Sequence, residues 1–164
     1  MRFFIDTEFN AEIGPNIELI SIGIAAADGR NYYAVSSEFD PDKCSDWVKE
    51  NVFPKLGEGP RSTLLEMRKD ITAFVGKKPA QFWGYYAAWD WLLLGQHIMG
   101  GMMKLPANWR EICMDVKQWQ IQAGAPQYMG LPAHLAHNAL NDAIWTMEYH
   151  EHLSIWGHEN KNAV

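Results

Sequence analysis

The segment MRFFIDTEF, residues 1–9, determines how the chain begins to fold. Its middle, Phe3-Phe4-Ile5, is a short apolar run of residues that favour strands. Because alternate side chains of a strand share a face, we expect Asp6 and Glu8 to point to one side and Thr7 to the other. Two carboxylates therefore converge at the end of a hydrophobic strand, where they are costly unless a cation or a donor compensates them.

This acidic pair allows two interpretations. A hard divalent metal ion with oxygen ligands is the natural compensation for two converging carboxylates. An acidic pair is equally typical of a strand that simply exits into solvent. Taken alone, the spacing of Asp6 and Glu8 leaves both interpretations open.

Strand and helix signals alternate along the rest of the chain. A polar break is predicted over residues 10–16, a strand over 17–27, and a returning antiparallel strand over 31–37 after the hairpin signal Asp28-Gly29. The later predicted elements are a helix around Trp47 that Pro54 ends, a helix over 62–75, a strand over 80–86, a helix over 89–99, a weak strand over 111–116, a short helix over 117–123 and a long helix over 138–156. This order predicts an α/β fold around a mixed sheet.

Length and charge narrow the class of protein. With 164 residues and 48% hydrophobic content, the chain is expected to form a single domain over 1–164. The net charge of -6 leaves no basic stripe to grip a long duplex, so a nucleic-acid substrate would be held by its end, with bound cations supplying positive charge. The acids at positions 6 and 8 interrupt any apolar leader, and we expect a cytoplasmic protein without a membrane partner.

Asp90 follows an aromatic stretch at a predicted strand-to-helix junction, in the sequence Tyr85-Tyr86-Ala87-Ala88-Trp89-Asp90. An aspartate at the start of a helix usually caps it or interacts with its dipole. In open α/β sheets, however, the functional crevice lies at the strand ends, which is where this residue is expected.

The segment from His137 to Asp142 carries the remaining candidate residues. Five residues of helix amount to about 500°, so two helical side chains at that spacing would not share a face. Asn138 is a good N-cap, which leaves His137 on the preceding loop and Asp142 in the first turns of the helix. From a loop, His137 could fold back beside Asp142, although a surface or packing role also fits a lone histidine.

Together these motifs resemble the DEDDh class of 3′-to-5′ exonucleases. Asp6 and Glu8 match its Asp-x-Glu motif, Trp89-Asp90 matches its second motif, and His137 with Asp142 matches its His-x-x-x-x-Asp motif. Stretches outside these residues, over 1–9, 17–23 and 33–41, are similar to the bacterial polyadenylate-specific exoribonuclease AS family. The resemblance spans nearly the whole chain.

The resemblance implies a fold, a cofactor and a mechanism. The implied fold is ribonuclease-H-like (DnaQ-like exonuclease), a mixed β-sheet flanked by α-helices. Two Mg²⁺ or Mn²⁺ ions per active site are implied, with Asp6, Glu8 and Asp142 as direct ligands and Asp90 supporting the second ion. His137 would act as the general base on the attacking water.

The substrate implied by the resemblance is a single-stranded RNA 3′ end, with a preference for 3′ adenylates, and the implied assembly is a homodimer. Thr7, Phe9 and Trp89 are the candidate substrate-binding residues, since aromatic faces stack on unpaired bases. Trp89 and Trp91 face different ways on a helix, so at least one of them should pack in the core.

Other functions stay open at this point. Proofreading enzymes of the class carry Thr where this chain has Phe9, and Asn where it has Tyr86, which argues against DNA proofreading. An oligoribonuclease-like enzyme or a single-stranded DNA exonuclease is the alternative within the class. A nucleic-acid-binding module without catalysis is the alternative from another class.

Overall fold

A computed structural model describes residues 1–11, 17–57 and 61–160 of the chain. Its centre is a six-stranded mixed sheet with the strand order β4-β3-β2-β1-β5-β6. The predicted polar break over 10–16 falls mostly outside the described residues, and Asn10 itself belongs to the first strand.

The antiparallel half of the sheet follows the local sequence signals. β1 (Arg2–Asn10) pairs with β2 (Glu18–Ala26), which pairs with β3 (Asn31–Ser36). The predicted hairpin between β2 and β3 is confirmed: the Gly29 N–H donates to the Ala26 carbonyl at 2.9 Å, and Gly29 has a φ of 89°, which favours glycine. The register of β1 and β2 places Asp6 opposite Gly23, a pairing that matters for the site.

The parallel strands bring segments that are distant in sequence to the same end of the sheet. β5 (Gln81–Gly84) runs parallel to β1, and β6 (Met114–Asp115) runs parallel to β5. The predicted strand over 111–116 is therefore only two residues long, and the short β4 (Arg61–Ser62) beside β3 was not predicted. Because β1 and β5 are parallel, the end of β1 and the residues after β5 lie at the same end of the sheet.

The predicted helices are present with small shifts in their bounds. They are α1 (Asp46–Asn51), α2 (Leu64–Val75), α3 (Ala88–Leu93), α4 (Val116–Ala123) and α5 (Ala139–Glu159), with short 3₁₀ turns at Pro41–Lys43, Phe53–Lys55 and Met102–Lys104. The helix predicted over 89–99 is divided, because α3 continues as a π-helix over Leu94–Ile98. None of the helices in the described ranges is long and apolar enough to cross a membrane.

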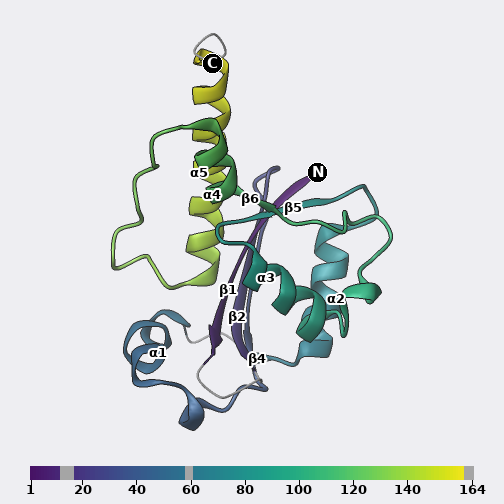
Figure 1. Cartoon of the computed structure of the whole chain (residues 1–164). Helices are drawn as coiled ribbons and strands as arrows, with labels where there is room; N and C mark the ends of the chain where they lie inside the picture. Colours follow the sequence, from purple (N-terminus) through teal and green to yellow (C-terminus); the bar gives the residue numbers. More distant parts are fainter. Residues whose placement is uncertain (12–16, 58–60, 161–164) are drawn as a thin grey trace.

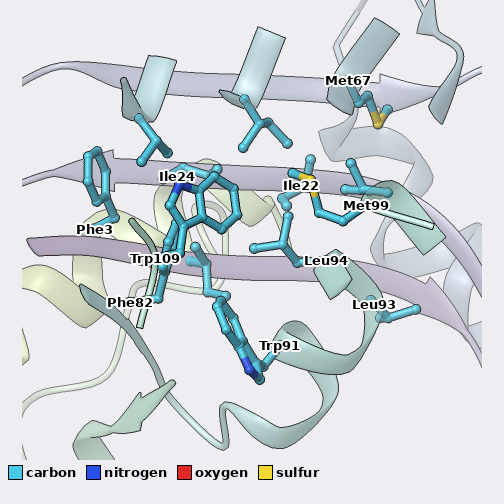
Figure 2. Packing of buried hydrophobic residues seen from close by; sticks show 14 of the residues in the cluster. Phe3, Ile22, Ile24, Met67, Phe82, Trp91, Leu93, Leu94, Met99 and Trp109 are labelled. Carbon is cyan, nitrogen blue, oxygen red and sulfur yellow. The ribbon is translucent and has the colours of Figure 1, made fainter. Parts of the chain in front are cut away.

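Helices cover both faces of the sheet, with α4 and α5 on one side and α2 and α3 on the other (Figure 1). Side chains alternate between the two faces of β1 and so contribute to both cores. Phe3 and Ile5 pack in the core with α2 and α3, whereas Phe4 packs in the core with α4 and α5. Figure 2 shows the first of these cores, in which Trp91 packs with its neighbours. The expectation that one of the two tryptophans near Asp90 belongs to the core is therefore confirmed, and that residue is Trp91.

Candidate active site

Asp6, Glu8 and Asp142 come together at the end of β1. Each offers one carboxylate oxygen, and the three oxygens lie within 4.8 Å of one another. The alternation of β1 places Asp6 and Glu8 on the face that α5 covers, and Asp142 lies in the first turn of that helix. The structure thus brings together the three residues that the family resemblance implied as a group.

The start of α5 lies close to the sheet because Gly23 has no side chain. A Cβ at Gly23 would lie 2.2 Å from the carbonyl carbon and oxygen of Ala139, the first residue of α5. Since Gly23 is paired with Asp6, the first turn of the helix rests directly beside Asp6. Only glycine permits this approach of two backbones.

The cap of α5 is as expected from the sequence. Asn138 is the N-cap, and its side chain accepts a hydrogen bond from the Asn141 N–H at 3.2 Å. Asp142 in turn accepts from the Asn138 N–H at 3.1 Å. These two bonds fix the direction in which the Asp142 carboxylate leaves the helix.

The electrostatics of the cluster oppose full ionisation. Burial raises the pKa of Asp6 well above its ordinary value, and the neighbouring Asp90, Glu8 and Asp142 raise it further. Burial, followed by Asp142 and Asp90, raises the pKa of Glu8 to about 8. Burial also raises the pKa of Asp142, which the hydrogen bond from Asn138 and the proximity of His137 oppose.

A divalent cation fits this donor set. Carboxylate oxygens are hard ligands of the kind that Mg²⁺ and Mn²⁺ prefer. The mutual repulsion of Asp6, Glu8 and Asp142 would be relieved by a positive charge among them, and no Lys or Arg forms an ion pair with any of the three within the described ranges. The residues that could hold a metal are therefore Asp6, Glu8 and Asp142.

Asp90 lies on α3, on the face of the sheet opposite to α5. It is 5% exposed, and its Oδ1 accepts from the Thr7 N–H at 2.9 Å and from the Thr7 hydroxyl at 2.6 Å. Burial raises the pKa of Asp90 to about 7, although the two bonds from Thr7 oppose this. Thr7, a candidate substrate-binding residue, is itself 5% exposed and uses both donors on Asp90. The geometry gives Thr7 the role of fixing Asp90.

His137 lies on the loop before α5, as the helix argument predicted. Its backbone is in the left-handed region, with a φ of 65°. Its ring stands edge-on to the ring of Trp47, with the centroids 5.0 Å apart. Trp47 belongs to α1 and is 52% exposed, so this contact places a solvent-facing indole beside the candidate base.

Phe9, which follows Glu8, and Trp89, which precedes Asp90, form an aromatic pair. Their rings are stacked, with centroids 5.9 Å apart and an interplanar angle of 28°. Trp89 is 51% exposed. The two candidate stacking residues are thus packed on each other at the surface next to Glu8 and Asp90.

A hollow of about 360 Å³ opens directly beside Glu8. Its lining includes Phe9, Asn10 and Trp47. Asn10 is only 1% exposed; its Nδ2 donates to the Lys43 carbonyl at 3.0 Å, and its Oδ1 has no partner among the described residues.

The sequence did not single out Asn10 or Trp47 as functional residues. Asn10 could have been suspected, because a polar side chain two residues after Glu8 on a strand shares its face. Trp47 carried only a helical signal, and nothing local connects it with His137, which is 90 residues away in the chain.

Among solved structures, a chain in the structure of the yeast NOT1 MIF4G domain co-crystallised with CAF1 matches with a TM-score of 0.60. The match covers 96% of this chain and 80% of that one at 14% identity, so the likeness concerns the fold alone. We expected a ribonuclease-H-like, DnaQ-like fold. This finding contradicts the expectation, because the matching structure is described as that of a MIF4G domain. The motifs behind that expectation determine the geometry around five residues and do not specify a whole fold.

Two curated proteins of Mycobacterium tuberculosis are similar along most of the chain. One is 3′-5′ exoribonuclease Rv2179c of strain ATCC 25618 / H37Rv, which is 40% identical over 150 residues, 87% of each chain. The other, 3′-5′ exoribonuclease MT2234.1 of strain CDC 1551 / Oshkosh, matches with the same identity and coverage. Residues 1–154 also match the family described as the 3′-5′ exoribonuclease Rv2179c-like domain. With its acidic cluster inside the matched residues, the chain belongs to the Rv2179c-like 3′-5′ exoribonuclease family.

Proposed function

We propose that this protein is a metal-dependent 3′-to-5′ exoribonuclease of the DEDDh type, which releases nucleoside 5′-monophosphates from single-stranded RNA ends. The observation that carries the proposal is the convergence of the Asp6, Glu8 and Asp142 oxygens within 4.8 Å of one another, in a chain of an exoribonuclease family. Asp90 and His137 complete the set.

In the proposed mechanism, Asp6, Glu8 and Asp142 would hold Mg²⁺ or Mn²⁺, and Asp90 would support a second ion. Such ions would supply positive charge at the scissile phosphate and make the attacking water easier to deprotonate. His137 takes the proton from the water whose oxygen attacks phosphorus, and the bond from phosphorus to the 3′ oxygen of the preceding nucleotide breaks. The 3′ oxygen takes up a proton from solvent, so the shortened RNA leaves with a 3′-hydroxyl, and the released nucleotide carries the 5′-phosphate.

The test is a digestion of 5′-labelled RNA with Mg²⁺ or Mn²⁺. We expect shortening by single nucleotides from the 3′ end, release of monophosphates, and no product in EDTA or with Asp6→Ala. A-tailed RNA, mixed-sequence RNA, a dinucleotide and single-stranded DNA are compared in parallel. Preference for the dinucleotide would favour an oligoribonuclease-like enzyme, and efficient cleavage of DNA would favour a DNA exonuclease. RNA binding without any product would favour a binding module without catalysis.

We further propose that the hollow beside Glu8 receives the terminal base and favours adenine over guanine and uracil. Phe9 and Trp47 offer aromatic faces for stacking. The bond from Asn10 Nδ2 to the Lys43 carbonyl sets the orientation of the amide, so the acceptor without a partner is Oδ1. A buried acceptor is costly when unpaired, and the exocyclic amines of adenine and cytosine are donors where guanine and uracil carry a carbonyl.

This preference is measured with four RNAs that differ only in the 3′-terminal base. We expect kcat/KM to be higher for terminal A than for terminal G or U, and Asn10→Ala to reduce that ratio. Because the ratio compares substrates on one protein sample, it is insensitive to the fraction of folded enzyme. An unchanged ratio in Asn10→Ala would assign the preference to other residues.

A homodimer is the proposed assembly. Exposed apolar side chains on and beside the edge strand β6, Ile112 and Met114, would fit an interface, because exposed sheet edges are usually covered or protected. Sedimentation velocity at micromolar concentration tests the proposal, and a monomer throughout would reject it.

A further inference from the structure

The backbone of His137 needs support from outside its own loop. A φ of 65° is a left-handed conformation that non-glycine residues adopt at an energetic cost. Such a conformation persists only where the surroundings determine it. The ring of a general base must also be held within a narrow range of positions, since a displacement of about 1 Å can cost roughly 100-fold in rate.

Lys55 provides contacts on both sides of His137. Its Nζ donates to the Ala133 carbonyl at 2.9 Å and to the Ala136 carbonyl at 3.2 Å. The Ala136 carbonyl belongs to the peptide unit that enters His137. On the other side, the Nδ2 of Asn138 donates to the carbonyl of Lys55 itself at 2.8 Å.

The segment around Lys55 also orients the imidazole. Lys55 ends the 3₁₀ turn Phe53–Lys55, which follows directly after α1, and α1 carries the Trp47 ring that contacts His137. Neither ion pair within the described ranges involves Lys55, so its ammonium group is committed to the two loop carbonyls. One continuous segment therefore contacts the backbone before His137, the side chain of Asn138 after it, and the His137 ring.

We propose that Lys55 is a positioning residue, which fixes the loop so that the His137 imidazole faces the attacking water. This inference rests on the proposed function, in which His137 is the general base. Lys55 touches neither the reacting atoms nor the carboxylate oxygens of the cluster in this scheme. Its charge also opposes the rise in the pKa of Asp142, and the proposed role is the separate one of placing His137.

A double-mutant cycle tests this role. Lys55→Met removes the two donors and keeps most of the length of the side chain, and it is combined with His137→Ala. In the otherwise wild-type protein we expect Lys55→Met to lower kcat about tenfold while KM for RNA changes less than about twofold, because the base acts in the chemical step. In the His137→Ala background we expect Lys55→Met to have no further effect on kcat.

The matched control is Lys49→Met. Lys49 lies on α1, and its Nζ also donates to a backbone carbonyl, that of Asp42 at 3.2 Å, away from the loop of His137. We expect this variant to keep wild-type kcat and KM. Thermal melts of all variants establish that they are folded; if Lys55→Met melts without a cooperative transition, Lys55→Gln takes its place in the cycle.

The outcomes separate the inference from the function on which it rests. Wild-type turnover of His137→Ala would reject the base assignment itself. A slow His137→Ala protein together with wild-type turnover of Lys55→Met would reject only the role of Lys55. Equal losses from Lys55→Met in both backgrounds would also reject it, because an effect of the lysine charge on Asp142 or on RNA persists without the imidazole.

Discussion

At the scale of single residues, the carboxylates of the cluster link pH to folding. Burial and the neighbouring acids Asp142 and Asp90 hold the pKa of Glu8 at about 8, against an ordinary value of 4.5. The native metal-free protein therefore binds more protons than the unfolded chain between these two values. Since the free energy of unfolding falls with pH wherever the native state binds more protons, this group favours folding at low pH and loses that contribution as pH rises toward about 8.

Glu8→Gln should remove this pH dependence without removing the shape of the side chain. In EDTA we expect the variant to be more stable than the wild type, by an amount that grows as pH rises from 4.5 toward about 8. Adding Mg²⁺ should then stabilise the wild type more than the variant, because binding to the native state shifts unfolding. Urea unfolding at a series of pH values measures both effects. Parallel pH profiles for the two proteins would contradict the electrostatic description of the site.

At the scale of elements, the position of α5 against the sheet is what places Asp142 beside Asp6. The contact depends on Gly23, whose absent side chain leaves room for the backbone of Ala139. A shift of the helix by the thickness of one methyl group would move Asp142 away from its partners. The acidic cluster thus depends on the packing between β2 and α5 as well as on the acidic residues themselves.

Gly23→Ala is therefore predicted to affect stability and activity together. A Cβ 2.2 Å from the Ala139 carbonyl must displace α5, and overpacking of this kind typically costs about 1–3 kcal/mol. We expect kcat to fall more than the loss of folded protein accounts for, as measured by RNA digestion alongside urea unfolding. Gly157→Ala on α5 is the control: a Cβ there meets nothing within 4 Å, and the change should stabilise the helix by about 0.5–1 kcal/mol without affecting kcat.

The elements that the sequence predicted well are those with local signals. The Asp28-Gly29 turn, the Asn138 cap and the alternation of β1 each depend on neighbouring residues, and all three are found in the structure. The two-residue strand β4 and the π-helix after α3 have no such signal, because distant pairing and packing determine them.

The site divides in the same way. Strand alternation predicted that Asp6 and Glu8 share a face, the family resemblance implied that Asp142 joins them, and the loop position of His137 followed from the geometry of a helix. The bond between Thr7 and Asp90 was beyond prediction, since it joins residues 83 positions apart across the layers of the fold. The ribonuclease-H-like label was wrong for a related reason: motifs describe a site, and many global arrangements can carry the same one.

At the scale of the whole molecule, charge determines how RNA can be held. The chain has 20 acidic and 14 basic residues, so its net charge repels a polyanion unless metal ions intervene. A basic hollow of about 700 Å³ is present on the outer face of α2, lined by Arg68, Lys69 and Lys77 among others. None of these three forms an ion pair within the described part of the chain. RNA could therefore contact the protein at its end only, or along this face as well.

The salt dependence of KM separates the two modes. For single strands, the logarithm of affinity falls with the logarithm of salt concentration by about 0.7 for each phosphate contact. An enzyme that holds only the last one or two phosphates should give a slope of about 0.7–1.4 for KM against salt, at constant Mg²⁺. Because the hollow on α2 would then lie outside the path of the RNA, Lys77→Glu should leave both KM and the slope unchanged. A steeper slope that Lys77→Glu reduces would instead indicate that the RNA upstream of its 3′ end contacts α2. Metal ions and stacking at the 3′ end would then be insufficient to bind the RNA.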